Sequence, residues 1–194
     1  MIDIPLRCQC GTVRGNVRLK AASDGNHVTC YCTDCQAFAR HLPSTDAILD
    51  EWGGTEIYQT APWTIEIQAG REHLRCLRLK PKGLYRWYTD CCNTAVGNAV
   101  SVKLPFFGLI HSFIDNGESG TKLLGPMIGH YKLESATGDV PEPIRKLGMP
   151  TSATLKVFWR ILKWKLMAGR KPNPFFDQEG KAISPPTVLK ANRR

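Results

Sequence analysis

Eight cysteines stand in tight groups, and this grouping limits what the chain can fold into more than any other feature. They occupy positions 8, 10, 30, 32, 35, 76, 91 and 92, so seven of the eight form the patterns C-x-C, C-x-C-x-x-C and C-C. Disulfide scaffolds usually space their cysteines more widely, whereas thiols one or two residues apart are typical of ligand loops for a soft metal ion. The pattern therefore predicts a metal-binding fold, ahead of a redox role or inert core thiols.

The N-terminal sequence and the overall hydropathy indicate a compartment for these thiols. The start, MIDIPLRCQCG, has the acidic Asp3 and no apolar core of a secretory signal. No run of 18 apolar residues suggests a membrane-spanning helix. We therefore expect a cytoplasmic protein, in which thiols stay reduced. Its 194 residues suit one domain, with or without an appendage.

Charge is concentrated near the C-terminus. Lys and Arg number 26 and Asp and Glu number 17, a formal net charge of +9. Residues 1–150 hold 16 basic and 15 acidic residues, whereas residues 151–194 hold 10 basic and 2 acidic residues. A nearly neutral body argues against a dedicated nucleic-acid-binding fold, while the basic C-terminal part suits contact with a phosphate-rich surface.

Alternating apolar and polar residues predict a mainly β fold. The repeated spacing of strands and turn residues favours antiparallel strands, in an all-β body. The clearest expected strands are residues 6–20 in part, 55–60, 64–68, 73–80 and 84–89.

Other segments of the body are less regular. Residues 28–35 suggest a strand that runs into a tight turn, and residues 36–51 suggest loops with a short helix. Residues 104–114, LPFFGLIHSFI, are apolar enough to pack as a short helix or a covering loop.

The C-terminal part has one strong helix pattern. We expect a zinc-binding β domain over residues 1–135, a Pro- and Gly-rich linker over 136–152, and an amphipathic helix with a basic tail over 153–194. The helix is predicted over 154–170, with Thr151 or Ser152 as its N-cap.

Three roles are open for this helix. Its basic stripe, which includes Lys156, Arg160 and Lys163, would face solvent if the helix docks on the body or across a homodimer. Alternatively, Trp159, Trp164 and the lysines would attach the helix to an anionic membrane surface. Contact with nucleic acid is the least favoured of the three.

The C-x-C-x-x-C motif supplies three ligands from six residues. Side chains two apart on a strand share a face, so Cys30 and Cys32 point the same way, and the following turn returns Cys35 to them. Three thiolates leave one position of a tetrahedral zinc ion open, as in catalytic zinc sites. Cys8 and Cys10 need ligands from elsewhere, and Cys91 and Cys92 are the available group.

These motifs together resemble the family of glutathione-dependent formaldehyde-activating enzymes and centromere protein V. The matching pieces are Cys8-Gln9-Cys10-Gly11, Cys30-Tyr31-Cys32-Thr33-Asp34-Cys35 and Cys92-Asn93-Thr94, within roughly residues 5–100. The resemblance implies an Mss4-like β-tent with a structural zinc at Cys8, Cys10 and the late cysteines. It also implies a second, functional zinc at Cys30, Cys32 and Cys35, where a thiol such as glutathione could approach.

The late motif departs from the family pattern C-x-x-C-G-T. Thr89 stands where the first cysteine belongs, and Asn93 replaces the glycine. Asn tolerates the left-handed backbone that glycine would supply, but Thr cannot replace a thiolate ligand. Cys91 would have to supply that ligand from a distorted turn, because adjacent strand residues face opposite ways. Cys76, within an alternating strand, is expected to be an ordinary buried residue.

The resemblance leads to two candidate functions. The first is a carbon–sulfur lyase acting on a small thiol adduct of the glutathione–aldehyde type. In that case Asp34 and His41 are the nearest candidates for acid or base, and Arg7, Arg40 and Arg71 for binding substrate carboxylates. The second is a non-catalytic zinc module whose basic helix associates with a protein, a membrane surface or nucleic acid. A fourth protein ligand at the three-cysteine site would favour this second role.

Overall fold

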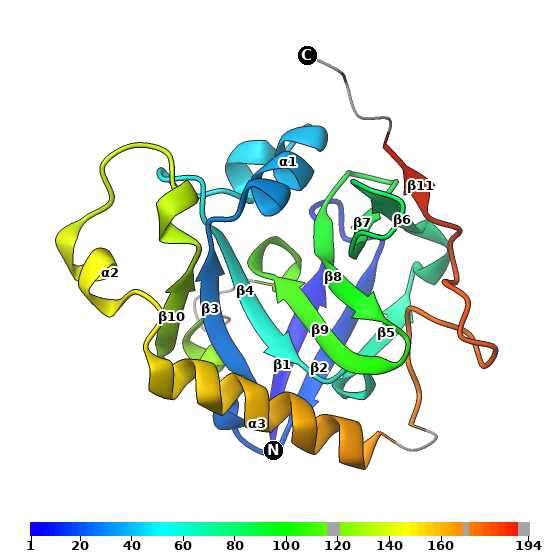
Figure 1. The fold of residues 1–194 in the computed structure, drawn as a ribbon. Helices are drawn as coiled ribbons and strands as arrows, with labels where there is room; N and C mark the ends of the chain where they lie inside the picture. The colour runs from blue at the N-terminus through cyan, green and yellow to red at the C-terminus, as the bar shows by residue number, and fades with distance from the viewer. Residues whose placement is uncertain (116–120, 169–170, 190–194) are drawn as a thin grey trace.

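The structure, a computed structural model, describes residues 1–115, 121–168 and 171–189. It is mainly β, as predicted, and within these residues the strands form two sheets (Figure 1). The smaller sheet pairs β1 (Ile2–Arg7), β2 (Arg14–Leu19) and β5 (Ile65–Ala69) in that order. Both of its strand pairs are antiparallel.

The larger sheet has eight strands. In order across the sheet they are β10 (Met127–Tyr131), β3 (Asn26–Cys30), β4 (Thr55–Thr60), β9 (Leu104–Ile110), β8 (Ala95–Ser101), β7 (Tyr85–Thr89), β6 (Leu74–Arg78) and β11 (Thr187–Val188). The interior pairs are antiparallel, but the edge strands β10 and β11 each run parallel to their neighbour. The expectation of a purely antiparallel body is therefore wrong at both edges of this sheet.

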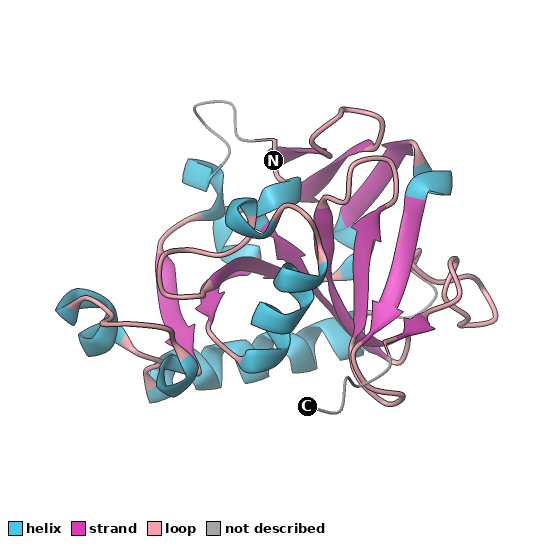
Figure 2. Ribbon diagram, turned by 90° about the horizontal axis from the view of Figure 1, so that it is seen from above, coloured by secondary structure: helices cyan, strands magenta, loops and turns pink. Residues whose placement is uncertain are grey.

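Three α-helices lie around the strands in the described part of the chain. They are α1 (Thr33–His41), α2 (Glu142–Leu147) and α3 (Thr151–Met167). Figure 2 shows the strands forming the bulk of the body with the helices on its outside. None of the described helices is both long and apolar enough to cross a membrane.

The segment 104–114 is a strand over most of its length, which corrects the expectation of a helix or loop. β9 lies between β4 and β8 and pairs with both. A central strand is covered on both faces, so its sequence is a continuous apolar run without alternation, and periodicity cannot distinguish it from a buried helix. Pro105 is tolerated because it lies near the hairpin end of the strand, beside an irregularity in the β8 pairing and before the pairing with β4 begins.

The turn expected after β3 is instead the start of a helix. Cys32 is the N-cap residue of α1, and its sulfur accepts a hydrogen bond from the backbone N–H of Cys35 at 3.4 Å. Because a cap residue has extended backbone geometry while the next residues are helical, the change of direction is as sharp as a turn. The motif therefore spans a strand end and the first turn of a helix.

The C-terminal part differs from expectation in its boundaries. α3 begins at Thr151 behind the cap residue Pro150, so neither Thr151 nor Ser152 is the N-cap, and it ends at Met167 rather than at residue 170. The segment expected to be a linker contains α2. Pro is well suited to a helix start because the first N–H groups have no partner inside the helix.

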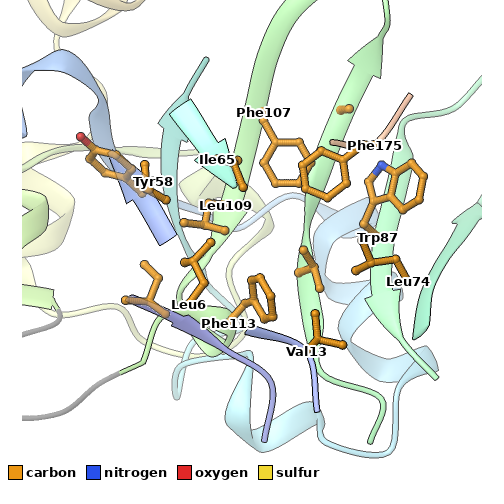
Figure 3. Close-up of a cluster of buried hydrophobic side chains, with 14 of the residues drawn as sticks. Leu6, Val13, Tyr58, Ile65, Leu74, Trp87, Phe107, Leu109, Phe113 and Phe175 are labelled. Carbon is orange, nitrogen blue, oxygen red and sulfur yellow. The ribbon is translucent and has the colours of Figure 1, made fainter. Parts of the chain in front are cut away.

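Residues after α3 return to the hydrophobic core (Figure 3). Phe175 stacks on Phe107 with ring centroids 4.0 Å apart and also packs beside Trp87. All three rings are fully buried. Such burial is worth about 1.5–3 kcal/mol per large apolar side chain, so the segment that follows α3 contributes to the stability of the β body.

Candidate metal centres

Four cysteines gather at one end of the body. The sulfur atoms of Cys8, Cys10, Cys91 and Cys92 all lie within 4.8 Å of one another. Cys10 Sγ lies 3.5 Å from both Cys8 Sγ and Cys91 Sγ. Four sulfurs bound to zinc at about 2.3 Å would be about 3.8 Å apart in a tetrahedron. The donor atoms and their spacing therefore fit a zinc ion.

The first two ligands come from a tight loop between β1 and β2. The N–H of Gly11 donates to the carbonyl of Cys8 at 2.8 Å, and the N–H of Val13 donates to the sulfur of Cys8 at 3.1 Å. Gly11 has φ of +78°, which a residue with a side chain rarely adopts. The loop thus turns both thiols of the C-x-C motif toward one point.

The other two ligands come from the turn between β7 and β8. Asn93 has φ of +57°, a left-handed backbone conformation that Asn tolerates. The N–H of Asn93 donates to the carbonyl of Thr89 at 2.8 Å. This distorted turn brings the adjacent Cys91 and Cys92 into the same cluster, with sulfurs 3.8 Å apart.

Thr89 lies beneath the cluster in a supporting position. It is fully buried, its hydroxyl lies 3.4 Å from Cys92 Sγ, and it accepts from the N–H of Thr94 at 3.2 Å. Although partial burial opposes ionisation, the hydroxyls of Thr89 and Thr94 lower the pKa of Cys92 to about 5. Burial and the neighbouring thiols raise the pKa of Cys91 to about 12. Four thiolates so close together would repel one another, so all four would ionise only around a bound cation.

Three further cysteines form a second cluster at the end of β3. The sulfurs of Cys30, Cys32 and Cys35 lie within 4.8 Å of one another. Cys30 and Cys32 are half-buried, whereas Cys35 is buried. Within the described part of the chain, no fourth Cys, His, Asp or Glu joins this group. The three thiols are a soft donor set that could hold a metal ion such as zinc.

Two positive groups face these three thiols. The cluster lies at the N-terminus of α1, where unpaired N–H groups carry partial positive charge. The guanidinium of Arg86 lies 3.9 Å from Cys35 Sγ and donates to Asn98 Oδ1 at 3.1 Å. Arg86 is only 2% exposed, so little water screens its charge. Contacts with Cys30 and then Cys35 lower the pKa of Cys32, and Arg86 lowers it further.

The remaining neighbours of the cluster are apolar. Val28 and Ile57 are buried beside it, and Ile128 and Tyr131 pack against them. Contacts with Cys32 and then Cys35, together with burial, raise the pKa of Cys30 well above the ordinary value. Close thiols oppose ionisation of one another, so one thiolate raises the pKa of its neighbours.

The other predicted site residues do not converge on the three cysteines. Asp34 lies next to Cys35 in the first turn of α1, with its carboxylate 3.5 Å from Lys80 Nζ. His41 ends the same helix and is exposed, about 9 Å further along the axis than Cys35 at 1.5 Å per residue. The nearest described cation to the thiols is Arg86, which is not among the residues predicted from the sequence.

The three predicted arginines lie in different places. Arg7 lies over the loop of the four-cysteine cluster, where its guanidinium approaches Gly11. Arg40 donates to Gln36 Oε1 at 3.0 Å on α1. Arg71 donates to the carbonyl of Pro174 at 3.3 Å, and both residues line a cavity beside α3. Their separation means that they do not form a common anion site.

No sequence motif around Arg86 predicts that it lies beside the three cysteines. It occupies the middle of the aromatic strand β7, whose neighbours Tyr85 and Trp87 suggest a packed surface. The only signal is a charged residue within such a strand, since a buried Arg needs a partner. Cys76, by contrast, is buried as predicted, and burial raises its pKa to about 12.

Comparison with known proteins places the chain in a family. A crystal structure of a protein from Rhodobacter sphaeroides is similar with a TM-score of 0.45 and 14% sequence identity, covering 66% of this chain and 100% of that one. No curated protein matches the chain. A model for a family of unknown function, DUF6151, matches residues 2–185, which include both cysteine clusters and α3. The chain therefore belongs to DUF6151.

Proposed function

We propose that the chain is a zinc protein whose three-cysteine cluster acts on a small thiol adduct, as a carbon–sulfur lyase of the glutathione–aldehyde type. The observation that carries the proposal is the open cluster of Cys30, Cys32 and Cys35, which has no fourth ligand among the described residues. The motif resemblance to glutathione-dependent formaldehyde-activating enzymes, with their Mss4-like fold, supports the same choice of chemistry.

The metal would supply one kind of chemistry here. Zinc bound by three cysteines stabilises the thiolate form of a thiol that occupies its remaining position. In the cleavage direction, the C–S bond of a hemithioacetal breaks and its electron pair stays on sulfur. The hydroxyl proton leaves as the carbonyl forms, so the products are a thiolate and an aldehyde. The reverse direction adds the thiolate to the aldehyde carbon.

The chain's own residues would hold this site in place. The helix start at Cys32 fixes two of the thiols, and Arg86 offsets part of their negative charge from within the core. The apolar side chains of Ile57, Ile128 and Tyr131 restrict water on one side. Low local water content strengthens each of these electrostatic contacts.

Substrate binding would use the rim of the cluster. Asp34 precedes Cys35 in the chain and pairs with Lys80 at 3.5 Å, and both side chains are exposed enough for the Lys80 ammonium to reach a substrate carboxylate. Asp34 is better placed than His41 to move a proton, since it adjoins Cys35. Lys80→Ala should weaken binding of glutathione adducts, while that of a small uncharged thiol adduct stays unchanged.

The proposal is tested by metal content and exchange kinetics on the same protein. Purified wild type is expected to hold two zinc ions and to speed exchange between glutathione, formaldehyde and their hemithioacetal, followed by NMR. Cys32→Ser should keep one zinc and the fold but lose the rate enhancement. A wild-type protein with two zinc ions and no acceleration for any thiol–aldehyde pair would contradict lyase activity.

A second candidate is a zinc module without catalysis, whose basic helix provides an association surface. It is favoured by one observation: the cavity of about 1020 Å³ lies beside α3 and is lined by none of the cysteines. In that case both zinc ions would only stabilise the fold. Loss of folding in Cys32→Ser as severe as in Cys92→Ser would favour this alternative.

A further inference from the structure

Helix α3 presents apolar side chains on two opposite faces. One face packs on the body through Ala153, Val157 and Trp164, all of which are buried. The other face carries Leu155, Phe158, Trp159 and Leu166, which are 53%, 58%, 58% and 81% exposed. At about 100° per residue these four lie within one stripe, roughly opposite Trp164. A helix that only covers the body would need just the first face.

The orientation of the stripe is fixed by contacts on the buried side. The Arg160 guanidinium donates to the carbonyl of Gly25 at 2.8 Å and also to that of Ser23. Arg160 was expected on a solvent-exposed basic stripe, and this contact corrects that placement. With Arg160 and Trp164 held by the body, the helix cannot rotate to bury the exposed stripe.

Positive charge lies on both edges of the stripe. Lys156 and Lys163 fall on one side of it and Lys165 on the other, and all three are exposed. Residues 151–170 contain no Asp or Glu. Long lysine side chains beside an apolar stripe can reach phosphate groups while their methylene stems follow the apolar surface.

A cationic cavity adjoins the same helix. It measures about 1020 Å³, and Trp159 belongs to both its lining and the stripe. Lys171 Nζ lies 4.5 Å from the centroid of the Trp63 ring, and both residues line the cavity. The lining has seven basic and two acidic residues, a difference of +5: Arg18, Lys20, Arg71, Lys156, Arg160, Lys163 and Lys171 against Asp24 and Glu66.

Few of these cations are already neutralised. Arg18 pairs with Glu66 at 3.0 Å. Among the described residues, Lys20, Lys156 and Lys163 form no ion pair. The cavity and the helix edge therefore hold unpaired positive charge next to exposed apolar rings.

Unpaired cations beside exposed apolar rings favour one kind of molecule as the binding partner of this face of α3. A second copy of the chain meeting α3 face to face would place like charges together, which is unfavourable. Nucleic acid would satisfy the lysines but would leave the apolar stripe in water. A bilayer containing acidic phospholipids satisfies both, because phosphates lie at the depth of the lysines and acyl chains accept the apolar residues.

We propose that α3 binds the chain to membranes rich in acidic phospholipid, with Leu155, Phe158, Trp159 and Leu166 in the acyl boundary. The cavity beside the helix then takes a lipid phosphate between Lys156, Lys163 and Lys171. Arg160 contacts Gly25 just before β3, and Cys30 ends β3, so α3 and the three-cysteine cluster lie at opposite ends of that strand (Figure 1). Membrane binding therefore leaves the cluster open and does not depend on the proposed lyase activity.

The test is co-sedimentation of the zinc-loaded protein with vesicles. Vesicles of phosphatidylcholine alone are compared with vesicles containing 30% phosphatidylglycerol. We expect binding to the acidic vesicles only, weakened by raising the salt concentration because screening shortens the range of the charges. Equal binding to both vesicles, or binding to neither, would overturn the proposal.

Two variants and a matched control locate the surface. Phe158→Ser with Trp159→Ser should weaken binding by at least about 100-fold, since two large apolar side chains stay in water. Lys156→Glu with Lys163→Glu should cause a loss of similar size. The control Val188→Ser removes an exposed apolar side chain on β11, at the edge of the larger sheet away from α3 (Figure 1), and should bind as wild type.

Two further measurements distinguish membrane insertion from self-association. Brominated acyl chains should quench fluorescence in wild type and much less in Trp159→Phe, which keeps an apolar ring. Light scattering in the absence of vesicles should give a monomer mass. A dimer that Phe158→Ser with Trp159→Ser dissociates would show that a second copy covers the stripe, and would overturn the membrane proposal.

Discussion

The two cysteine clusters use the same ligand atom but differ in what they connect. The four-cysteine cluster joins the β1–β2 loop to the β7–β8 turn, so that Cys10 contacts Cys91, 81 residues away. The three-cysteine cluster lies within six residues, at the end of one strand and the start of α1. Closing a long loop constrains the chain far more than closing a short one. The first cluster can therefore stabilise the fold, and the second adds little connectivity.

The two clusters also differ in their number of cysteines and in the groups that surround them. The four-cysteine cluster is complete, and its supporting partners are the neutral hydroxyls of Thr89 and Thr94. The three-cysteine cluster lacks a fourth ligand among the described residues and has the buried cation Arg86 beside it. Complete tetrahedral sites are typically structural, whereas sites with an open position bind substrates. These differences are consistent with a fold-stabilising role for the four-cysteine cluster and with the proposed chemistry at the three-cysteine cluster.

The largest effect is expected from Cys92→Ser. This change removes one of four ligands from a cluster that holds two distant loops together. Structural zinc sites in small domains contribute about 10–16 kcal/mol of binding free energy, comparable to the whole stability of a domain. We expect a loss of one zinc ion per chain and a collapse of the thermal transition, measured by metal analysis and circular dichroism.

The matched control is Cys76→Ser, which changes a buried thiol outside both clusters. It should cost about 1–3 kcal/mol for a buried hydroxyl, with the zinc content unchanged. A Cys92→Ser protein that melts like this control would show that the four-cysteine cluster does not hold the fold together.

The second prediction concerns Cys32→Ser in the open cluster. One zinc ion should be lost, but the thermal midpoint should fall by only a few degrees, since the site closes no long loop. Serine can still accept the N-cap hydrogen bond from Cys35, so α1 should persist. Metal analysis and circular dichroism, run beside Cys92→Ser, provide the measurement. Equal destabilisation in both variants would remove the distinction between the clusters.

The sequence was informative where chemistry repeats locally. The cysteine spacing predicted which cysteines lie together, and alternation located β4, β5, β6 and β7 to within about a residue or two. It failed for β9, because a strand covered on both faces has no period of two. It also missed the role of Phe175, since nothing local shows that a tail returns to stack on Phe107.

The position of Arg86 at the candidate site could not be predicted for the same reason. Arg86 reaches Cys35 only because β7 and α1 are brought together by the fold, 51 residues apart in sequence. The choice between Thr89 and Cys91 likewise depended on a turn geometry that strand alternation does not describe. Residues that act across the fold need tertiary information, whereas ligand motifs can be identified from spacing alone.

The third prediction concerns the buried cation that only the open cluster has. Arg86→Met removes the guanidinium beside Cys35 and leaves the buried Asn98 Oδ1 without its donor. We expect a stability loss of about 1–3 kcal/mol in denaturant unfolding. Because Arg86 lowers the pKa of Cys32, the pKa of the Cys32 thiol should rise in this variant. Alkylation of the metal-free protein should then need a higher pH.

Arg86→Lys separates charge from shape in this experiment. Lysine keeps the positive charge but lacks the forked donor geometry. It should restore most of the alkylation profile while recovering less of the stability. If both variants alkylate at the wild-type pH, Arg86 only packs the core and does not tune the cluster.

The smallest predicted effect is a pH dependence that neither cluster causes. His27 Nε2 lies 2.6 Å from Glu56 Oε1, and Nδ1 lies 2.9 Å from the carbonyl of Gly125. Although burial opposes protonation of His27, its contacts with Glu56 and Gly125 raise the pKa of the imidazole. The contact with His27 lowers the pKa of Glu56.

The raised pKa of His27 and the lowered pKa of Glu56 determine the pH range in which the pair stabilises the fold. Stabilisation through His27 is full below its ordinary pKa of about 6.5 and disappears as the pH rises through the raised value. Stabilisation through Glu56 is present above its ordinary pKa of about 4.3 and is lost as the pH falls through the lowered value. The pair is therefore strongest between about pH 4.5 and 6.5.

His27→Gln should flatten the decline in unfolding free energy above pH 6.5 without changing the zinc content. A decline that persists in His27→Gln but vanishes in Cys32→Ser would assign it to the open cluster instead.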